Sequence, residues 1–182
     1  MVIDAANVAG SAVLPGCGKF CWDRVDLVRQ AWRNQVDPKA TFVMVMDTGP
    51  SNQLGASCRR KYRDERQAGE VIEVDFGDPE ILRIAEESDA AVITGDFYKD
   101  QRRDHPWIDG NRSQFFQWEV EHGAVVIVGR DMGIPSDFSK TRAEERAELK
   151  GMGADVAKPE VERALRRVYR CDTDTCWLHK YD

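Results

Sequence analysis

The chain has 182 residues, a mass of 20.7 kDa and a formal net charge of −6 at neutral pH. This length suits one domain, or one domain with a small appendage. The acidic balance argues against a simple phosphate-binding surface, because such a surface needs Lys and Arg, unless several of the acids form one metal site. The sequence has no signal peptide and no apolar run of about 18 residues, so we expect a soluble, cytoplasmic protein without a membrane partner.

The cysteines are odd in number, so they cannot all pair in internal disulfides, and we expect reduced thiols. They are Cys17, Cys21, Cys58, Cys171 and Cys176.

The first half of the chain predicts strands that alternate with helices. Val2 and Ile3 form a short strand that ends at Asp4, and a glycine-rich loop at 10–18 follows, which we expect to be mobile or to face a substrate. Apolar residues at a helical period predict a helix over 21–35, and the β-branched run at 41–46 predicts the next strand.

The next segments continue this alternation. Residues 51–69 are polar and basic, and predict one helix capped by Ser51 and ended by Gly69. A short strand is expected at 71–74. Asp78 followed by proline has the chemistry of a helix start, and predicts a helix that leads to a strand at 90–93.

Residues 113–122 are predicted to form another helix, ended by Gly123, before a last strand at 124–128. Two charged surface helices are expected beyond it, at 139–150 and 159–170. Strands that alternate with helices indicate a parallel, doubly wound α/β sheet with right-handed crossovers.

A carboxylate follows each of four predicted strands, and these acids are Asp4, Asp47, Asp96 and Asp131. Ligands bind outside the carboxyl ends of parallel strands in open α/β sheets. Acids that converge there need a counter-charge, which a divalent metal ion can provide. Taken alone, each acid is more often a turn or capping residue, and Asp78 in particular has a complete capping explanation.

Three motifs in order resemble the NYN branch of the PIN-like nucleases, closest to the Regnase-like ribonucleases. They are VIDAANVAG at 2–10, DPEILRIAEESDAAVITGDFYKD at 78–100 and VVIVGRDMGIPSD at 125–137. The resemblance implies a three-layer α/β/α fold with a mostly parallel central sheet. It assigns residues 1–137 to a PIN-like nuclease domain and leaves 138–182 as a C-terminal helical extension. It also implies a metal-dependent ribonuclease.

The resemblance carries over six candidate catalytic residues, which are Asp4, Asn7, Asp78, Asp96, Asp100 and Asp131. Asp4, Asp78 and Asp96 are expected to face the metal directly or through water, and Asp100 and Asp131 to hold waters or a second ion. Asn7 would orient a carboxylate or a phosphate oxygen. Asp47 lies at a strand end but has no counterpart in the family pattern, and Thr94-Gly95-Asp96 stands where that pattern tends to have Ser-Asn-Asp.

Phosphodiester cleavage requires polarised phosphoryl oxygens, a hydroxide near neutral pH and a neutralised leaving oxygen, and Mg²⁺ or Mn²⁺ can supply all three. These hard cations prefer oxygen ligands, which suits a site made of carboxylates.

Basic residues that would follow an RNA backbone are Arg59, Arg60, Lys61, Arg63, Arg102 and Arg103. A solvated helix face explains the first four equally well. Tyr62 is a candidate for stacking on a base. Trp107 is expected to pack, and His105, which precedes a proline, is expected to belong to a structural loop.

The C-terminal segment contains three potential zinc ligands, Cys171, Cys176 and His179, and resembles a zinc knuckle without its fourth member. Cys17 and Cys21 could complete it in space, but we favour unligated residues. We expect the chain to be a domain of a longer protein.

The sequence therefore predicts a Mg²⁺- or Mn²⁺-dependent endoribonuclease that acts on single-stranded or looped RNA. Two alternatives stay open: an inactive RNA-binding module with the same fold, and a metal-dependent phosphohydrolase that acts on a small substrate.

Overall fold

The computed structural model describes residues 1–133, 147, 150, 151 and 153. The chain divides into two units, Met1–Pro135 and Ser136–Asp182, and the fold below is that of the first unit. The expected helix at 139–150 lies outside the described residues except for 147 and 150. The expected helix at 159–170 and the C-terminal Cys and His residues lie wholly outside them. The division into a nuclease domain and a C-terminal extension stays a prediction.

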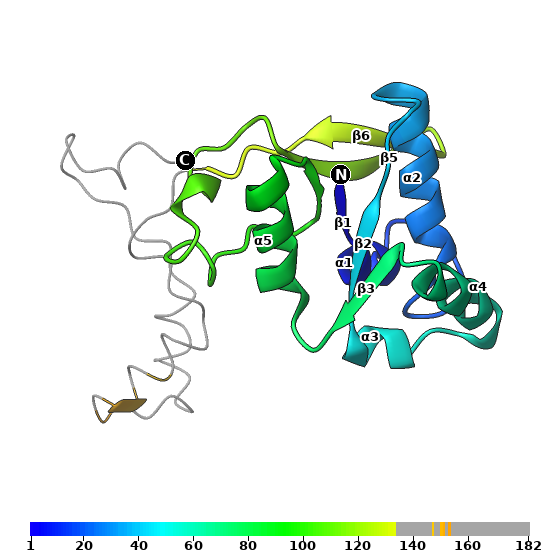
Figure 1. Cartoon of the computed structure of the whole chain (residues 1–182), viewed down its shortest axis with the longest axis horizontal. Helices are drawn as coiled ribbons and strands as arrows, with labels where there is room; N and C mark the ends of the chain where they lie inside the picture. The colour runs from blue at the N-terminus through cyan, green and yellow to red at the C-terminus, as the bar shows by residue number, and fades with distance from the viewer. Residues whose placement is uncertain (134–146, 148–149, 152, 154–182) are drawn as a thin grey trace. The chain divides into compact units, whose positions relative to one another are not determined.

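A six-stranded sheet forms the centre of the first unit, with the strand order β3-β2-β1-β4-β5-β6 (Figure 1). All neighbouring strands are parallel except β5 and β6, which are antiparallel. The strands are β1 (Val2–Asp4), β2 (Val43–Asp47), β3 (Val71–Val74), β4 (Val92–Ile93), β5 (Phe115–Glu121) and β6 (Ala124–Gly129).

Five α-helices and one 3₁₀ helix connect the strands. They are α1 (Ala5–Gly10), α2 (Asp23–Gln35), α3 (Thr48–Asn52), α4 (Ala56–Gln67), α5 (Gly77–Ser88) and the 3₁₀ helix η1 (Pro106–Ile108). Within the described residues, we find no helix with the length and apolar character that crossing a membrane requires.

The buried side chains of the strands alternate between two cores, one on each face of the sheet. Ile3 and Ile93 belong to the core that includes side chains of α1, α2 and α4. Val2 and Val92 belong to the other core, with side chains of α5 and the η1 region. Helices therefore cover both faces, and the predicted three-layer α/β/α fold with a mostly parallel sheet is confirmed.

The predicted helix at 113–122 is wrong, because this segment forms β5. Phe116, Trp118 and Val120 alternate with polar residues at a period of two, and aromatic and β-branched side chains favour strands. His122 and Gly123 both have positive φ, 50° and 80°, as the tight turns of hairpins require. The hairpin makes β6 antiparallel, so the expectation that its carboxyl end lies with those of the other strands is also wrong.

The single helix expected at 51–69 is two helices, α3 and α4. Ser51 lies within α3, where its hydroxyl donates a hydrogen bond to the carbonyl of Thr48 at 3.0 Å, and it caps neither helix. The glycine-rich loop is held in place, because the buried Arg24 side chain donates hydrogen bonds to the carbonyl groups of Leu14, Gly18 and Lys19.

Candidate active site

The candidate site lies where the sheet changes its direction of winding. The chain passes from β1 to β2 through helices on one face, and returns from β3 to β4 through α5 on the other face. The crevice between β1 and β4 is therefore the topological switch point, where ligands of doubly wound folds bind. Asp4 ends β1, and Thr94-Gly95-Asp96 directly follows β4.

Asp4 is buried, with 5% of its surface exposed, and both of its carboxylate oxygens accept hydrogen bonds. One accepts the backbone N–H of Asn7 at 3.0 Å and so caps α1, and the other accepts the Thr94 hydroxyl at 2.9 Å. Burial raises the pKa of Asp4 to about 7, and the negative charges of Asp78 and Asp47 add to this effect. A buried carboxylate among other acids is a place where a cation lowers the free energy.

Asn7 and Gly95 connect the ends of β1 and β4. The Asn7 side-chain oxygen accepts the backbone N–H of Gly95 at 3.0 Å. A Cβ atom at position 95 would lie 2.5 Å from that oxygen, so this contact requires glycine. In this chain an asparagine at 95, as in the Ser-Asn-Asp pattern, would require the Asn7 side chain to move.

Asp96 sits at the start of the loop after β4. Its backbone N–H donates to the Thr94 hydroxyl at 3.0 Å, and its carboxylate accepts the N–H groups of Phe97 and Tyr98. These bonds fix the exposed carboxylate directly after the carboxyl end of β4.

Tyr98 belongs to the same loop and is 1% exposed. Burial holds the pKa of its hydroxyl well above the usual range, and the negative charges of Asp4, Asp78 and Asp96 contribute. The Thr94 side chain lies close enough to oppose this pKa shift, but within the described part of the chain no hydrogen bond of normal geometry reaches the Tyr98 hydroxyl. A buried polar atom without a partner beside several carboxylates is a position where a water molecule is needed.

Asp78 brings α5 into the site. It lies in the first turn of this helix and is half-buried. Phe76 holds the N-cap position without a side-chain hydrogen bond, and the carboxylate of Asp47 accepts the N–H of Gly77 at 2.6 Å. The capping explanation for Asp78 is therefore wrong. Burial raises the pKa of Asp78 to about 6, and the charges of Asp96, Asp47 and Asp100 raise it further.

The structure thus groups five acids at one edge of the sheet: Asp4, Asp47, Asp78, Asp96 and Asp100. Four of these are predicted site residues, and Asp47 is the addition. Among the described residues, no three of these carboxylates bring ligand oxygens within 4.8 Å of one another. A single ion could therefore contact all of them only through water or after the side chains move, and a Mg²⁺ or Mn²⁺ site here stays a prediction.

Asp131 is the predicted site residue that lies elsewhere. β6 runs antiparallel to β5, and the residues after it move toward the amino ends of the parallel strands. The Asp131 carboxylate pairs with Arg112 at 2.8 Å and accepts the N–H of Gly133 at 2.9 Å, which keeps its pKa below the usual range. Its position gives no support to the predicted role.

Arg130 supports the site from the same segment, and sequence reasoning missed it. The side chain is buried, its guanidinium donates to the carbonyl of Gly95 at 2.9 Å, and it lies 3.9 Å from the centre of the Phe97 ring. It also pairs with Gln117. In the sequence, an arginine after a hydrophobic strand looks the same whether it supports a neighbouring loop or lies on the surface, so these contacts could not be predicted.

The predicted RNA-binding side chains differ in their availability. Arg60, Arg63 and Arg103 are exposed, and the structure gives them no ion pair among the described residues. Lys61 pairs with Asp26 and Glu65. Arg59 donates to the carbonyl of Leu54 at 2.9 Å.

Arg102 and Tyr62 are buried, so their positions do not support RNA contact. Arg102 is 8% exposed and donates to the carbonyl of Phe97 at 2.9 Å. The Tyr62 hydroxyl donates to Glu73, and its ring packs edge-on against Trp22.

The packing roles expected for Trp107 and His105 agree with their contacts. Trp107 stacks on Phe115 with ring centres 5.5 Å apart. His105 contacts Glu86 at 3.1 Å.

No family model and no curated protein matches the chain in sequence. Among solved structures, it is similar to the nuclear proteinaceous RNase P 2 (PRORP2) of Arabidopsis thaliana, of which two structures match with a TM-score of 0.55 each. Sequence identity is 13%, and the match covers 76% of this chain and 30% of the PRORP2 chain. The chain therefore spans less than a third of that protein, and the likeness is one of fold.

Proposed function

We propose that this chain is a metal-dependent endoribonuclease that hydrolyses single-stranded or looped RNA. The observation that carries the proposal is the grouping of Asp4, Asp78 and Asp96 at the switch point between β1 and β4. The fold shared with a protein-only RNase P favours RNA as the substrate. Closeness to the Regnase-like branch and a cytoplasmic location stay predictions.

Mg²⁺ or Mn²⁺ would be held by Asp4, Asp78, Asp96 and Asp100, and would polarise the phosphoryl group and stabilise the attacking and leaving oxygens. Asp47 has a different task, because it fixes the start of α5 and so the position of Asp78. Asn7 and Thr94 position the Asp96 loop and the Asp4 carboxylate relative to each other.

Two exposed aromatic rings flank the acids and support a substrate with unpaired bases. Phe76, 80% exposed, comes two residues before Asp78, and Phe97, 42% exposed, directly follows Asp96. Bases stack on exposed aromatic rings, and Phe97 is backed on one side by the Arg130 guanidinium. A small-molecule phosphohydrolase would have no use for them.

The inactive RNA-binding module is the stronger alternative. It would have the same fold, exposed rings and basic residues as a ribonuclease, but it would not need the acids to bind RNA. A cleavage assay with three substrates separates the possibilities: labelled single-stranded RNA, the same sequence as a duplex, and p-nitrophenyl phosphate. Each is incubated with Mg²⁺, Mn²⁺ or EDTA. The proposal expects metal-dependent cutting of the single strand.

Asp96→Asn serves as the inactive variant, because asparagine keeps the oxygen that accepts the N–H groups of Phe97 and Tyr98. Asp104→Asn is its control, since Asp104 is an exposed acid outside the group. Equal RNA binding by all proteins without cutting would favour the binding module. Turnover of only the small ester would favour the phosphohydrolase.

A further inference from the structure

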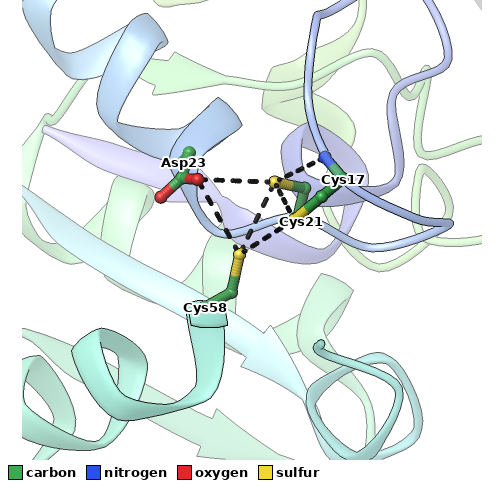
Figure 2. Close-up of side chains that lie close together, drawn as sticks. All are labelled: Cys17, Cys21, Asp23 and Cys58. Atoms are coloured by element: carbon green, nitrogen blue, oxygen red, sulfur yellow. Dashed lines mark hydrogen bonds between the residues drawn. The ribbon is translucent and has the colours of Figure 1, made fainter. Parts of the chain in front are cut away.

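Three cysteine sulfur atoms form a nearly equilateral triangle beside the carboxylate of Asp23 (Figure 2). Cys17 and Cys21 come from the loop between α1 and α2, and Cys58 comes from the first turn of α4. The sulfur atoms of Cys17 and Cys21 are 3.5 Å apart, those of Cys21 and Cys58 3.5 Å, and those of Cys17 and Cys58 3.7 Å.

A carboxylate completes the group. An Asp23 oxygen lies 3.8 Å from the Cys21 sulfur and 4.0 Å from the Cys58 sulfur. All four ligand atoms lie within 4.8 Å of one another. Figure 2 shows the four side chains pointing toward a common centre.

These distances fit a tetrahedral zinc ion. Zinc–sulfur bonds of about 2.3 Å give sulfur-to-sulfur edges of about 3.8 Å in a regular tetrahedron, and a zinc–oxygen bond of about 2.0 Å gives sulfur-to-oxygen edges of about 3.5 Å. A disulfide would instead join two sulfurs at about 2.0 Å and leave the third cysteine unused.

Ordinary packing of small apolar side chains does not explain the group. Cys21 and Cys58 are buried, as packed cysteines usually are, but Cys17 is exposed and still turns its sulfur toward them. Asp23 is exposed like Cys17, so these two residues form the solvent side of the group, where an ion can enter.

The surrounding backbone is arranged as in sites that hold thiolates. The N–H of Cys17 donates to the Cys21 sulfur at 3.2 Å. Cys58 lies at the amino end of α4, where the helix dipole favours negative charge. A Cβ atom at Gly16 would lie 2.9 Å from the Cys21 sulfur and 3.0 Å from the Arg24 side chain, so the loop fits closely around the sulfurs.

We propose that Cys17, Cys21, Cys58 and Asp23 bind one structural Zn²⁺. Binding releases the thiol protons to solvent and joins the loop after α1 to the starts of α2 and α4. Thiolates select zinc, whereas the acids near β1 and β4 select hard cations, so the two sites differ in metal. The proposal does not depend on the ribonuclease activity.

The test uses the full chain with Cys171→Ser and Cys176→Ser, which removes the cysteines of the C-terminal segment. Zinc per chain is measured by elemental analysis after gel filtration. Cobalt is then exchanged for zinc, and the absorption spectrum is recorded. We expect one zinc ion per chain, together with the near-ultraviolet charge-transfer band and the strong visible bands of tetrahedral cobalt with thiolate ligands.

Cys17→Ser in the same background is the decisive variant, because Cys17 is exposed and its loss leaves the core intact. This variant should lose bound zinc. If it still binds cobalt, the near-ultraviolet charge-transfer band should be weaker, because one of the three thiolates is gone. Asp23→Asn should keep the sulfur band but bind zinc more weakly.

Loss of all zinc in the Cys171→Ser, Cys176→Ser protein would overturn the proposal, as would full zinc retention by Cys17→Ser. A disulfide between any two of the three cysteines in freshly purified protein would also overturn it.

Discussion

The side-chain oxygen of Asn7 lies 3.0 Å from the backbone nitrogen of Gly95, and this hydrogen bond joins the ends of β1 and β4 together with the bond from the Thr94 hydroxyl to Asp4. Because a Cβ atom at 95 would lie 2.5 Å from the same oxygen, the contact exists only with glycine. The loop that carries Asp96 is therefore positioned by a residue from the first motif of the chain.

Gly95→Ala should displace Asn7 and move the Asp96 loop. We expect a loss of about 1–3 kcal/mol in the free energy of unfolding, as for overpacked sites, and reduced cleavage. Gly49→Ala is the matched control, since nothing lies within 4 Å of a Cβ atom there. Urea unfolding of both variants measures the difference, and equal stability of the two would show that the contact has no importance.

Stability without metal should depend on pH through Asp4. Its pKa is about 7 in the folded protein and 3.8 when unperturbed, so the folded state binds the proton more tightly. The contribution of Asp4 to the free energy of unfolding should therefore be largest below about pH 4. It should be lost as the pH rises to about 7, by a total on the order of 4 kcal/mol.

Asp4→Asn has no proton to lose, so its unfolding free energy should change less over this range. Urea denaturation in EDTA between pH 4 and pH 8 checks this, with Asp104→Asn as the control. Parallel pH profiles for the wild type and Asp4→Asn would contradict the prediction. Added Mg²⁺ should flatten the wild-type profile at high pH, because it binds the ionised acid.

Phe76→Ala with Phe97→Ala should weaken binding of single-stranded RNA, because base stacking contributes about 1–3 kcal/mol per ring. The effect should be smaller for duplex RNA, whose bases are already stacked. Val36→Ala, at an exposed apolar residue on the end of α2, controls for lost surface area. Fluorescence anisotropy with labelled RNA measures the affinities, and equal losses on single-stranded and duplex RNA would exclude stacking.

Arg60→Ala with Arg63→Ala should reduce the salt dependence of RNA binding. Each phosphate contact that is lost reduces the slope of log affinity against log salt concentration by about 0.7 for single strands. Lys61→Ala should change it less, because Lys61 already pairs with Asp26 and Glu65. An unchanged slope in the double variant would make this helix surface an ordinary solvated face.

Strand-end acids and helix periodicity predicted the parallel part of the sheet and four of the five grouped acids. The sequence misled where aromatic residues at 115–118 were assigned to a helix, although their alternation is typical of a strand. That error also placed Asp131 at the wrong edge, because a hairpin reverses the last strand.

The remaining features depend on long-range contacts. Asp47 ends a predicted strand, so the sequence placed it at this edge, but not its hydrogen bond with Gly77 at the start of α5, 30 positions away. Cys58 joins Cys17 and Cys21 only through the packing of α4 against the loop after α1. Spacing along the chain contains no signal for either contact.

The grouping of the acids is tested most directly by comparing two aspartates that both match the motifs. Asp78 lies within the group, whereas Asp131 pairs with Arg112 at the other end of the strands. Cleavage of a labelled single-stranded RNA is measured for the wild type, Asp78→Asn and Asp131→Asn, each with Mn²⁺ and with EDTA. We expect Asp78→Asn to cut about 10- to 100-fold more slowly than the wild type, or not at all. Asp131→Asn should cut like the wild type. Every protein that cuts should do so only with Mn²⁺. Equal activity of the wild type and Asp78→Asn, or cutting in EDTA, would contradict the account.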